Sequence, residues 1–207
     1  YFRLMNNINL SDYDNWVPIG SRNGKLFCGI LDGGGKTISN LRITNYNGYS
    51  GLFGAIDTMG SASHLTLENI SVQSSGQYAS GLVGELRGTI ANCHVTGNVS
   101  GTWDAGGLIG YVHNSGSVTN CSMVGNVSGE RSVGGLIGQS TSMNVTHCYT
   151  SGNVSAGGDG HTGGLIGVTR GTMVTNCYTA SNVRGGMWAT GGLIGSGTSG
   201  SVTNCIV

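Results

Sequence analysis

The sequence predicts an all-β protein, a parallel β-solenoid of about seven coils with roughly 28 residues and three short strands in each coil. The first observation is a pentapeptide, Gly-Gly-Leu-Ile-Gly, which occurs at residues 106–110, 134–138, 163–167 and 191–195. Looser copies at residues 51–54 and 81–84 extend the series, with steps of 30, 26, 28, 29 and 28 residues. Second, no segment has the length or the 3.6-residue apolar period of a helix. Self-similarity at such a step is the signature of a repeat architecture.

Residues 134–161 show how one coil is built. Strand candidates lie around Leu136 and Ile137, over residues 145–150 and over residues 153–155, and glycine or polar turns separate them. Each coil would pair with its neighbours at about 4.8 Å, so seven coils would give a rod about 35 Å long.

In-register stacking turns each repeat position into a column, and the apolar columns form the core because one coil cannot bury its apolar side alone. These columns are Leu108, Leu136, Leu165 and Leu193; Ile109, Ile137, Ile166 and Ile194; Ile90, Val118, Val145, Val174 and Val202; and Val99, Val127, Val154 and Val183. The leucine and isoleucine are consecutive and would face opposite sides of a flat strand. Either the flanking glycines bend the chain, or one of these two columns is half-buried.

The first 50 residues are predicted to form irregular coils of the same continuous domain, and residues 51–207 to form the regular repeats. Two short strands around a turn are expected in residues 1–20, followed by a strand over residues 26–31. Residues 32–35, Asp-Gly-Gly-Gly, are predicted to be a turn with positive φ angles. Terminal repeats of solenoids are commonly atypical because they cap an end.

The composition narrows the possible functions. The 207 residues include 40 glycines and one proline, only 9% are charged, and the net charge is zero with neutral histidine. Scattered basic residues argue against a nucleic-acid groove, and no apolar run reaches the ~18 residues of a membrane span. No signal peptide is visible. The chain starts at Tyr1 and stops in mid-repeat, so we expect a processed product or a piece of a larger protein.

Catalytic and metal-binding motifs are missing from the sequence. There is no CxxC pair and no HExxH, so neither a zinc site nor a zinc protease is expected. Glycoside hydrolysis needs two facing carboxylates, whereas Asp104, Glu130 and Asp159 occur once per coil at loosely equivalent places. We therefore predict no enzyme activity, no metal and no cofactor. A polysaccharide-active enzyme, or an ice-binding protein that uses a threonine column, remains as a third alternative. That column is Thr119, Thr146, Thr175 and Thr203.

Asparagine also recurs in columns. One column is Asn98, Asn126, Asn153 and Asn182, and a second is Asn92, Asn120, His147, Asn176 and Asn204. Stacked amides can hydrogen-bond from coil to coil, and asparagine tolerates left-handed backbone, so these columns predict structural ladders at turns. The alternative is N-glycosylation, for which a ladder amide is a poor acceptor. Formal sequons begin at Asn9, Asn69, Asn98, Asn120, Asn126, Asn144 and Asn153.

Five of the six cysteines follow the repeat. They are Cys93, Cys121, Cys148, Cys177 and Cys205. Their Cα atoms would lie about 4.8 Å apart, inside the disulfide range, but parallel side chains are poorly oriented for bridging and five members leave one unpaired. A buried ladder of free thiols is the first prediction, and disulfides are the alternative.

The loops just before each pentapeptide differ from coil to coil. In solenoids, such differences lie on one edge, which is often the binding edge. Candidate binding residues there are Trp103, Asp104, Asp159, His161 and Trp188. Trp103 and Trp188 are candidates for stacking on a sugar or packing on a partner. The competing interpretation is that each tryptophan shields the end of the core.

The repeated Gly-Leu-Ile-Gly, followed by Val-Thr-Asn-Cys-Tyr at residues 174–178 and by Gly-Asn-Val-Ser at residues 97–100, resembles the GLUG repeat of bacterial surface proteins. That family includes adhesins and the non-catalytic portions of IgA-cleaving metallopeptidases. Residues 16–20 and 31–38 are similar to what often precedes such repeats. The resemblance covers nearly the whole chain and implies a right-handed parallel β-helix on an extracellular surface. It implies no catalytic residue.

We therefore expect an extracellular structural or adhesive solenoid, a repeat segment of a bacterial surface adhesin or stalk. The alternative is an extracellular filament subunit that stacks end to end through uncapped ends. The expected partners are the chain itself or adjoining repeats of a longer chain, and a glycan or host surface protein. Neither nucleic-acid binding nor membrane insertion is expected.

Overall fold

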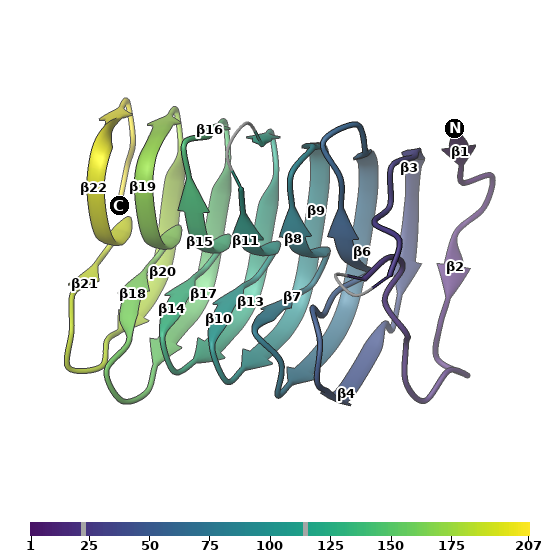
Figure 1. Cartoon of the computed structure of the whole chain (residues 1–207), viewed down its shortest axis with the longest axis horizontal. Helices are drawn as coiled ribbons and strands as arrows, with labels where there is room; N and C mark the ends of the chain where they lie inside the picture. Colours follow the sequence, from purple (N-terminus) through teal and green to yellow (C-terminus); the bar gives the residue numbers. More distant parts are fainter. Residues whose placement is uncertain (22–23, 114–115) are drawn as a thin grey trace.

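The protein is a rod-shaped parallel β-solenoid of about seven coils in a computed structural model that describes residues 1–21, 24–113 and 116–207 (Figure 1). Over these ranges all 22 regular elements are strands. The coils stack along the long axis, from the purple N-terminal end to the yellow C-terminal end in Figure 1. The predicted fold class is confirmed. The described residues include no helix long and apolar enough to cross a membrane.

Two ladders of strands follow each pentapeptide. The first contains β5 (Phe53–Ile56), β8 (Val83–Leu86), β11 (Ile109–Val112), β15 (Ile137–Thr141) and the first halves of β19 (Ile166–Thr175) and β22 (Ile194–Thr203). The second contains β12 (Ser117–Thr119), β16 (Asn144–Thr146), the second halves of β19 and β22, and the first parts of β3 (Ile30–Ser39), β6 (Ser61–Ser74) and β9 (Thr89–Gly101).

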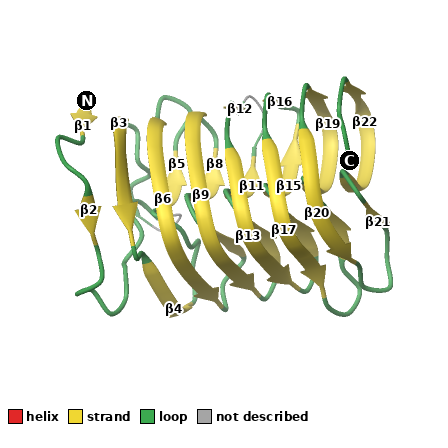
Figure 2. Ribbon diagram, turned by 180° about the vertical axis from the view of Figure 1, so that it is seen from behind, coloured by secondary structure: helices red, strands yellow, loops and turns green. Residues whose placement is uncertain are grey.

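The third ladder is the broad wall in Figure 2. It contains the later parts of β3, β6 and β9, with β4 (Arg42–Tyr46), β13 (Ser122–Gly129), β17 (Tyr149–Ala156) and β20 (Tyr178–Arg184). At the N-terminal end, the two-residue strands β1 (Phe2–Arg3) and β2 (Ile8–Asn9) pair with β3. The register of β13 on β17 is continuous from Ser122 opposite Tyr149 to Gly129 opposite Ala156, so equivalent residues stack in columns.

A fourth ladder adds to the three strands expected per coil. Its members are β7 (Tyr78–Ser80), β10 (Asp104–Gly106), β14 (Ser132–Gly134), β18 (His161–Gly163) and β21 (Thr190–Gly191), which form a separate parallel sheet. These strands occupy the ends of the segments predicted to be variable loops. A Cβ on Gly106 would lie 1.9 Å from the Ile109 carbonyl oxygen, so the chain turns there too tightly for any other residue.

The Leu–Ile pair of the pentapeptide sits at a bend, which decides between the two alternatives for these columns. The carbonyl oxygen of Leu136 accepts hydrogen bonds from the N–H groups of both Leu108 and Ile109, each at 3.0 Å. One acceptor that serves two consecutive donors marks a corner rather than a flat strand. Both side chains consequently point inward, and Leu108 and Ile109 are fully buried.

The repeated cysteines are free thiols that line the core. Cys93, Cys121, Cys148 and Cys177 are buried and Cys205 is half-buried. Each thiol donates to the carbonyl oxygen two residues before it, as from Cys121 to Thr119 at 3.2 Å. The adjacent thiol of Cys121, together with burial, raises the pKa of Cys93, which keeps that side chain a neutral, core-compatible group.

The N-terminal coils differ from the prediction in one strand and one turn. Residues 26–31 were expected to form a strand, but β3 begins only at Ile30 and runs through the glycines to Ser39. The apolar side chain of Phe27 is explained by packing and not by a strand, because its ring lies on Phe53 with centroids 4.8 Å apart. The backbone of Phe27 makes a single bridge to Ile56. Residues 32–35 do not form the predicted turn, because they lie inside β3. Gly34 and Gly35 do have the positive φ angles that were predicted, 58° and 70°, in a bulge where the register of β3 on β6 shifts.

The close stacking of coils predicts that alanine substitution has very different effects on stability at two glycines. Gly125 has a φ of 148°, and a Cβ there would lie 1.8 Å from the Gly97 carbonyl oxygen, whereas at Gly157 the nearest atom is 3.8 Å away. Gly125→Ala should therefore destabilise the fold by about 2 kcal/mol or more, and Gly157→Ala should change stability by less than about 0.5 kcal/mol. Denaturant unfolding followed by circular dichroism measures both. Equal stability of the two variants would contradict the coil spacing described here.

Candidate functional site

The variable segments lie along one edge of the rod, where the third ladder turns into the fourth. In Figure 1 this is the lower edge, between the ends of β13, β17 and β20 and the starts of β14, β18 and β21. Because successive coils are in register, residues that are about 28 positions apart in sequence become neighbours on this edge.

Three of the five predicted site residues share one surface hollow on this edge. Asp159, His161 and Trp188 line it, together with Glu130 and Arg131. Trp188 leaves 61% of its surface exposed, and its ring centroid lies 5.7 Å from that of His161. The hollow thus combines an exposed indole with two carboxylates, a guanidinium and an imidazole.

Glu130 and Arg131 are the members of the hollow that sequence reasoning did not select as binding residues. They are adjacent charged residues in a chain where only 9% of residues carry charge, and this local concentration is the signal that could have identified them. Arg131 also connects Trp103 to the hollow, because its guanidinium carbon lies 5.1 Å from the centre of the Trp103 ring. Trp103 itself is 45% exposed and does not line the hollow.

Asp104 does not line the hollow either. It begins β10 and is half-buried beside Ser132 of the next coil. Burial raises the pKa of Asp104 above its usual value, while a hydrogen bond from the Ser132 hydroxyl and the charge of Arg131 act in the opposite direction. The Asp104 carboxyl therefore stabilises the structure beneath the edge and is not part of the exposed surface of the edge.

His161 carries a group that needs a partner. Its Nδ1 is buried and makes no hydrogen bond to any of the described residues, although the imidazole is only partly covered. A buried nitrogen of this kind is costly unless water or a ligand meets it. The described residues contain no group of three or more His, Cys, Asp or Glu that could hold a metal ion.

The first asparagine column makes hydrogen bonds along the rod. Asn126 donates from Nδ2 to Oδ1 of Asn98 at 2.7 Å, Asn153 to Asn126 at 2.7 Å, and Asn182 to Asn153 at 3.4 Å. The sequon nitrogens of Asn126 and Asn153 are therefore engaged.

The second asparagine column lies at a turn with left-handed backbone. Asn92, Asn120, His147, Asn176 and Asn204 have φ angles of 51° to 54°. Asn120 donates to Asn92 at 2.7 Å, and the Asn176 Nδ2 lies 3.1 Å from the His147 Nε2. The threonine column runs in register beside it, and the hydroxyls of Thr119 and Thr146 lie 3.2 Å apart.

The repeats match a known family model. The model of the GLUG motif matches residues 101–128 and 129–155, which are two successive coils of the regular part. The protein carries GLUG motifs. These two coils contain Trp103, Glu130 and Arg131, so the edge of the GLUG repeats is also the edge that carries the hollow.

Two known proteins resemble this chain over longer stretches. Halomucin of Haloquadratum walsbyi is 38% identical over 123 residues, which are 56% of this chain, and the chain spans about 1% of the length of halomucin. The crystal structure of a putative immunoglobulin A1 protease from Bacteroides ovatus superimposes with a TM-score of 0.83 at 26% identity, covering 99% of this chain and 67% of that one. The GLUG motifs and the halomucin match fit a repeat segment of an extracellular surface protein.

The raised pKa of Asp104 predicts that replacing this residue increases the stability of the fold in a pH-dependent way. Because the folded state favours the protonated carboxyl, the contribution of this group to stability is lost as pH rises through its folded pKa. Asp104→Asn keeps an acceptor for Ser132 and removes the charge, so Tm should rise by about 2 °C at pH 7 and remain unchanged at pH 3. Thermal melts at both values measure this. Asp159→Asn, at an exposed carboxylate, is the control and should leave Tm unchanged; an Asp104→Asn variant that is less stable at pH 7 would contradict the assignment.

Proposed function

We propose that this chain is a structural and adhesive repeat segment of an extracellular surface protein, and that it presents the hollow at Trp188 to a carbohydrate. The rod supplies a rigid stalk, because each coil is held by backbone hydrogen bonds to the next. The GLUG motifs and the match to halomucin support a place on the cell surface.

The observation that carries the adhesive part is the exposed indole of Trp188 beside charged hydrogen-bonding groups. An indole face packs on the C–H face of a sugar ring, and carboxylate and guanidinium groups bond to its hydroxyls. Arg131, Glu130 and Asp159 line the same hollow as Trp188. Since tryptophan is usually highly buried, a ring with 61% of its surface exposed indicates a surface kept for contact.

We propose a non-enzymatic role for the segment, although the structural neighbour from Bacteroides ovatus is named for a protease activity. That name applies to that protein, a third of whose length lies outside the similarity. The support here is the repetition itself. A cysteine that recurs in four coils as a buried thiol, or a histidine that replaces asparagine at a turn, as at His64 and His147, serves the scaffold, whereas catalysis needs one particular pair.

Replacement of Trp188 tests the adhesive proposal. Trp188→Ala should reduce binding on a glycan array at least about tenfold, because aromatic anchors contribute the largest share at such sites. Met187→Ala is the matched control, since Met187 is in the same loop and is 85% exposed but offers no ring. Trp103→Ala should weaken binding less, because it acts only indirectly: Arg131 loses its contact with the Trp103 ring and is held less firmly in the hollow. Failure of the unaltered protein to bind any glycan, or equal loss with Met187→Ala, would reject this role.

A second proposal concerns the C-terminal end of the rod, where the edge of β22 is open. β22 is ten residues long and mostly exposed, Val202 is 53% exposed, and Leu193 and Ile194 are only half-buried although Leu165 and Ile166 are fully buried. Unpaired backbone beside exposed core is a template for another strand. We propose that an adjoining coil covers this edge.

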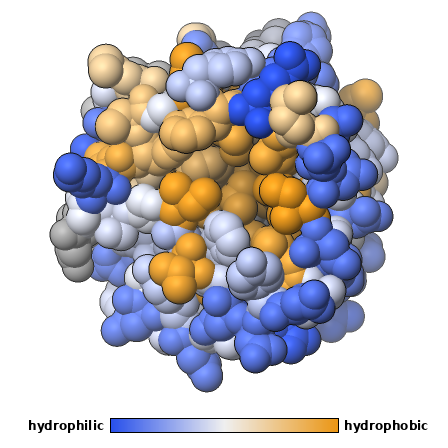
Figure 3. All heavy atoms as spheres, turned by 90° about the vertical axis from the view of Figure 1, so that its right-hand side faces the viewer, coloured by the Kyte–Doolittle hydropathy of each residue, from blue (hydrophilic) through white to orange (hydrophobic). Residues whose placement is uncertain are grey.

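The N-terminal end is built differently. Its face also exposes apolar residues, orange in Figure 3, but the strands that the described residues form at this end, β1 and β2, are each only two residues long. Short edge strands are a common protection against edge-to-edge pairing. If one copy stacked on the next, the ten-residue strand β22 would have to pair with the two-residue strands β1 and β2, and most of its backbone would stay unpaired. This favours adjoining repeats of a longer solenoid over an end-to-end filament.

In an isolated protein of these 207 residues no adjoining coil covers β22, so we expect two copies to associate through their β22 edges rather than end to end. Val202→Lys, on the open edge, should shift the population toward monomer, and Ile8→Lys, at the N-terminal end, should not. Light scattering over a concentration series measures both. A monodisperse monomer of the unaltered protein at high concentration would contradict the open edge as an interface.

A further inference from the structure

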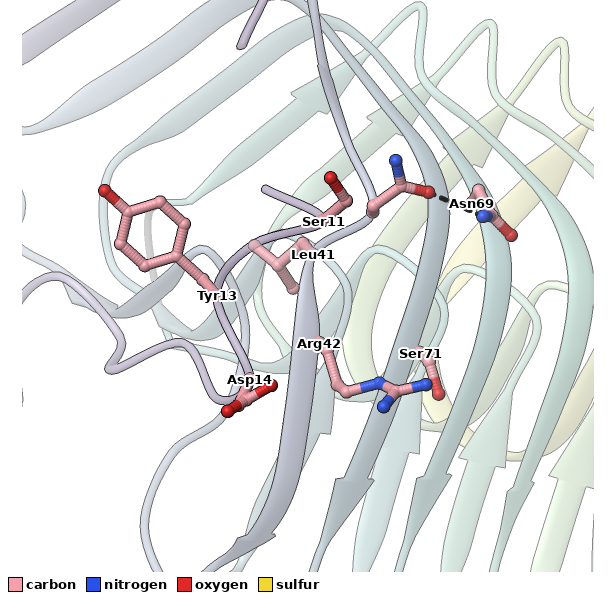
Figure 4. Close-up of a pocket in the computed structure, with 8 residues that line it drawn as sticks. Ser11, Tyr13, Asp14, Leu41, Arg42, Asn69 and Ser71 are labelled. Atoms are coloured by element: carbon pink, nitrogen blue, oxygen red, sulfur yellow. Dashed lines mark hydrogen bonds between the residues drawn. The ribbon is translucent and has the colours of Figure 1, made fainter. Parts of the chain in front are cut away.

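A second hollow lies at the N-terminal end of the rod, away from the Trp188 edge (Figure 4). It is lined by residues of three successive coils, among them Tyr13 and Asp14 of the first, Leu41 and Arg42 of the second, and Asn69 and Ser71 of the third. Leu41 is fully buried beneath it. Nothing in the repeat pattern indicates this site, because no other coil carries the same set of residues.

The wall formed by residues 11–14 is fixed at both of its ends. Leu10 donates its N–H to the Ser39 carbonyl oxygen at 2.9 Å, and Trp16 donates to the Arg42 carbonyl oxygen at 2.7 Å. Asn15 makes two further bonds to the backbone of Thr44, at 3.2 and 2.9 Å. The hollow is therefore preformed, which reduces the entropy that a ligand must overcome.

One polar side of the hollow is the end of an amide ladder. Asn69 donates to Asn40 at 2.7 Å, the dashed line in Figure 4, and Asn40 donates to Asn9 at 2.7 Å. The Asn40 amide is thus used on both sides, whereas the Oδ1 of Asn69 accepts no hydrogen bond from the described residues. The hydroxyl of Ser71 is likewise without a bond to them.

The other polar side carries two opposite charges that do not pair. Asp14 and Arg42 both line the hollow, yet neither takes part in an ion pair within the described ranges. Figure 4 shows the Arg42 side chain extended toward Ser71, with Asp14 on the opposite side of it. The guanidinium offers only donors and the carboxylate only acceptors, so the hollow presents both kinds of group to one ligand.

We propose that this hollow binds a neutral sugar unit. Adjacent hydroxyls, each both donor and acceptor, can bond to Asp14, Arg42, the Oδ1 of Asn69 and the hydroxyl of Ser71 at once, and the Tyr13 ring stands at the rim. An acidic sugar would bring its carboxylate into the same small hollow as the Asp14 carboxylate, and the repulsion between these two charges disfavours it even with Arg42 present. The inference extends the proposed carbohydrate-binding function to a second site and does not depend on the Trp188 hollow.

Titration of the ¹⁵N-labelled chain with neutral and uronic-acid oligosaccharides tests this site. Neutral ligands should shift the backbone amide resonances of Arg42 and Ser71, and Asp14→Asn and Arg42→Gln should each weaken that binding at least about fivefold. Asp12→Asn is the matched control and should have no effect, because Asp12 does not line the hollow. Thermal melts identify any variant that fails to fold, and Ser71→Ala then replaces it.

Trp188→Ala distinguishes the two sites, because it should leave the shifts at Arg42 and Ser71 unchanged. The inference would be overturned if Trp188→Ala abolished the binding of neutral sugars at both sites, or if Asp14→Asn and Arg42→Gln bound them with unchanged affinity. Tighter binding of the uronic acids, or no shifts at this hollow, would also overturn it.

Discussion

Backbone hydrogen bonding between equivalent residues of successive coils is the constraint on which the structure depends. Because β9, β13, β17 and β20 are paired without an offset in the regular part, every side chain lies above and below its own counterpart. An apolar residue must then recur to keep the core closed, and an amide must recur to complete its hydrogen bonds. The repetition of the sequence is thus a physical requirement of the stacking.

The same spacing explains the large glycine content. At the first glycine of the pentapeptide, a Cβ on Gly134 would lie 1.9 Å from a carbonyl oxygen, and one on Gly163 would lie 2.0 Å away. These glycines are required by close backbone approach and do not act as flexible linkers. A tight corner also lets consecutive leucine and isoleucine point inward together, which doubles the apolar side chains that one short segment buries.

The sequence alone was sufficient for the features that recur and insufficient for those that occur once. The columns of Leu108 and Val118 could be placed because four or more copies fix their register. Phe27 could not, because an apolar residue in an irregular coil looks the same whether it lies in a strand or packs on Phe53. The loop positions of Asp159, His161 and Trp188 were recognised as one edge, but Asp104 was not separated from them, since a turn into β10 changes its exposure.

Both hollows arise where the copies disagree, and the register of the solenoid explains why. A repeated column presents the same group at every coil and so offers no distinct place for one ligand. A ligand that contacts three coils needs three different residues at neighbouring positions, such as Glu130, Asp159 and Trp188 on one edge or Asp14, Arg42 and Ser71 at the other site. Parallel pairing brings them together at about 4.8 Å per coil. Substitutions at such exposed positions leave the buried columns intact, so one scaffold can acquire different binding sites without loss of its core.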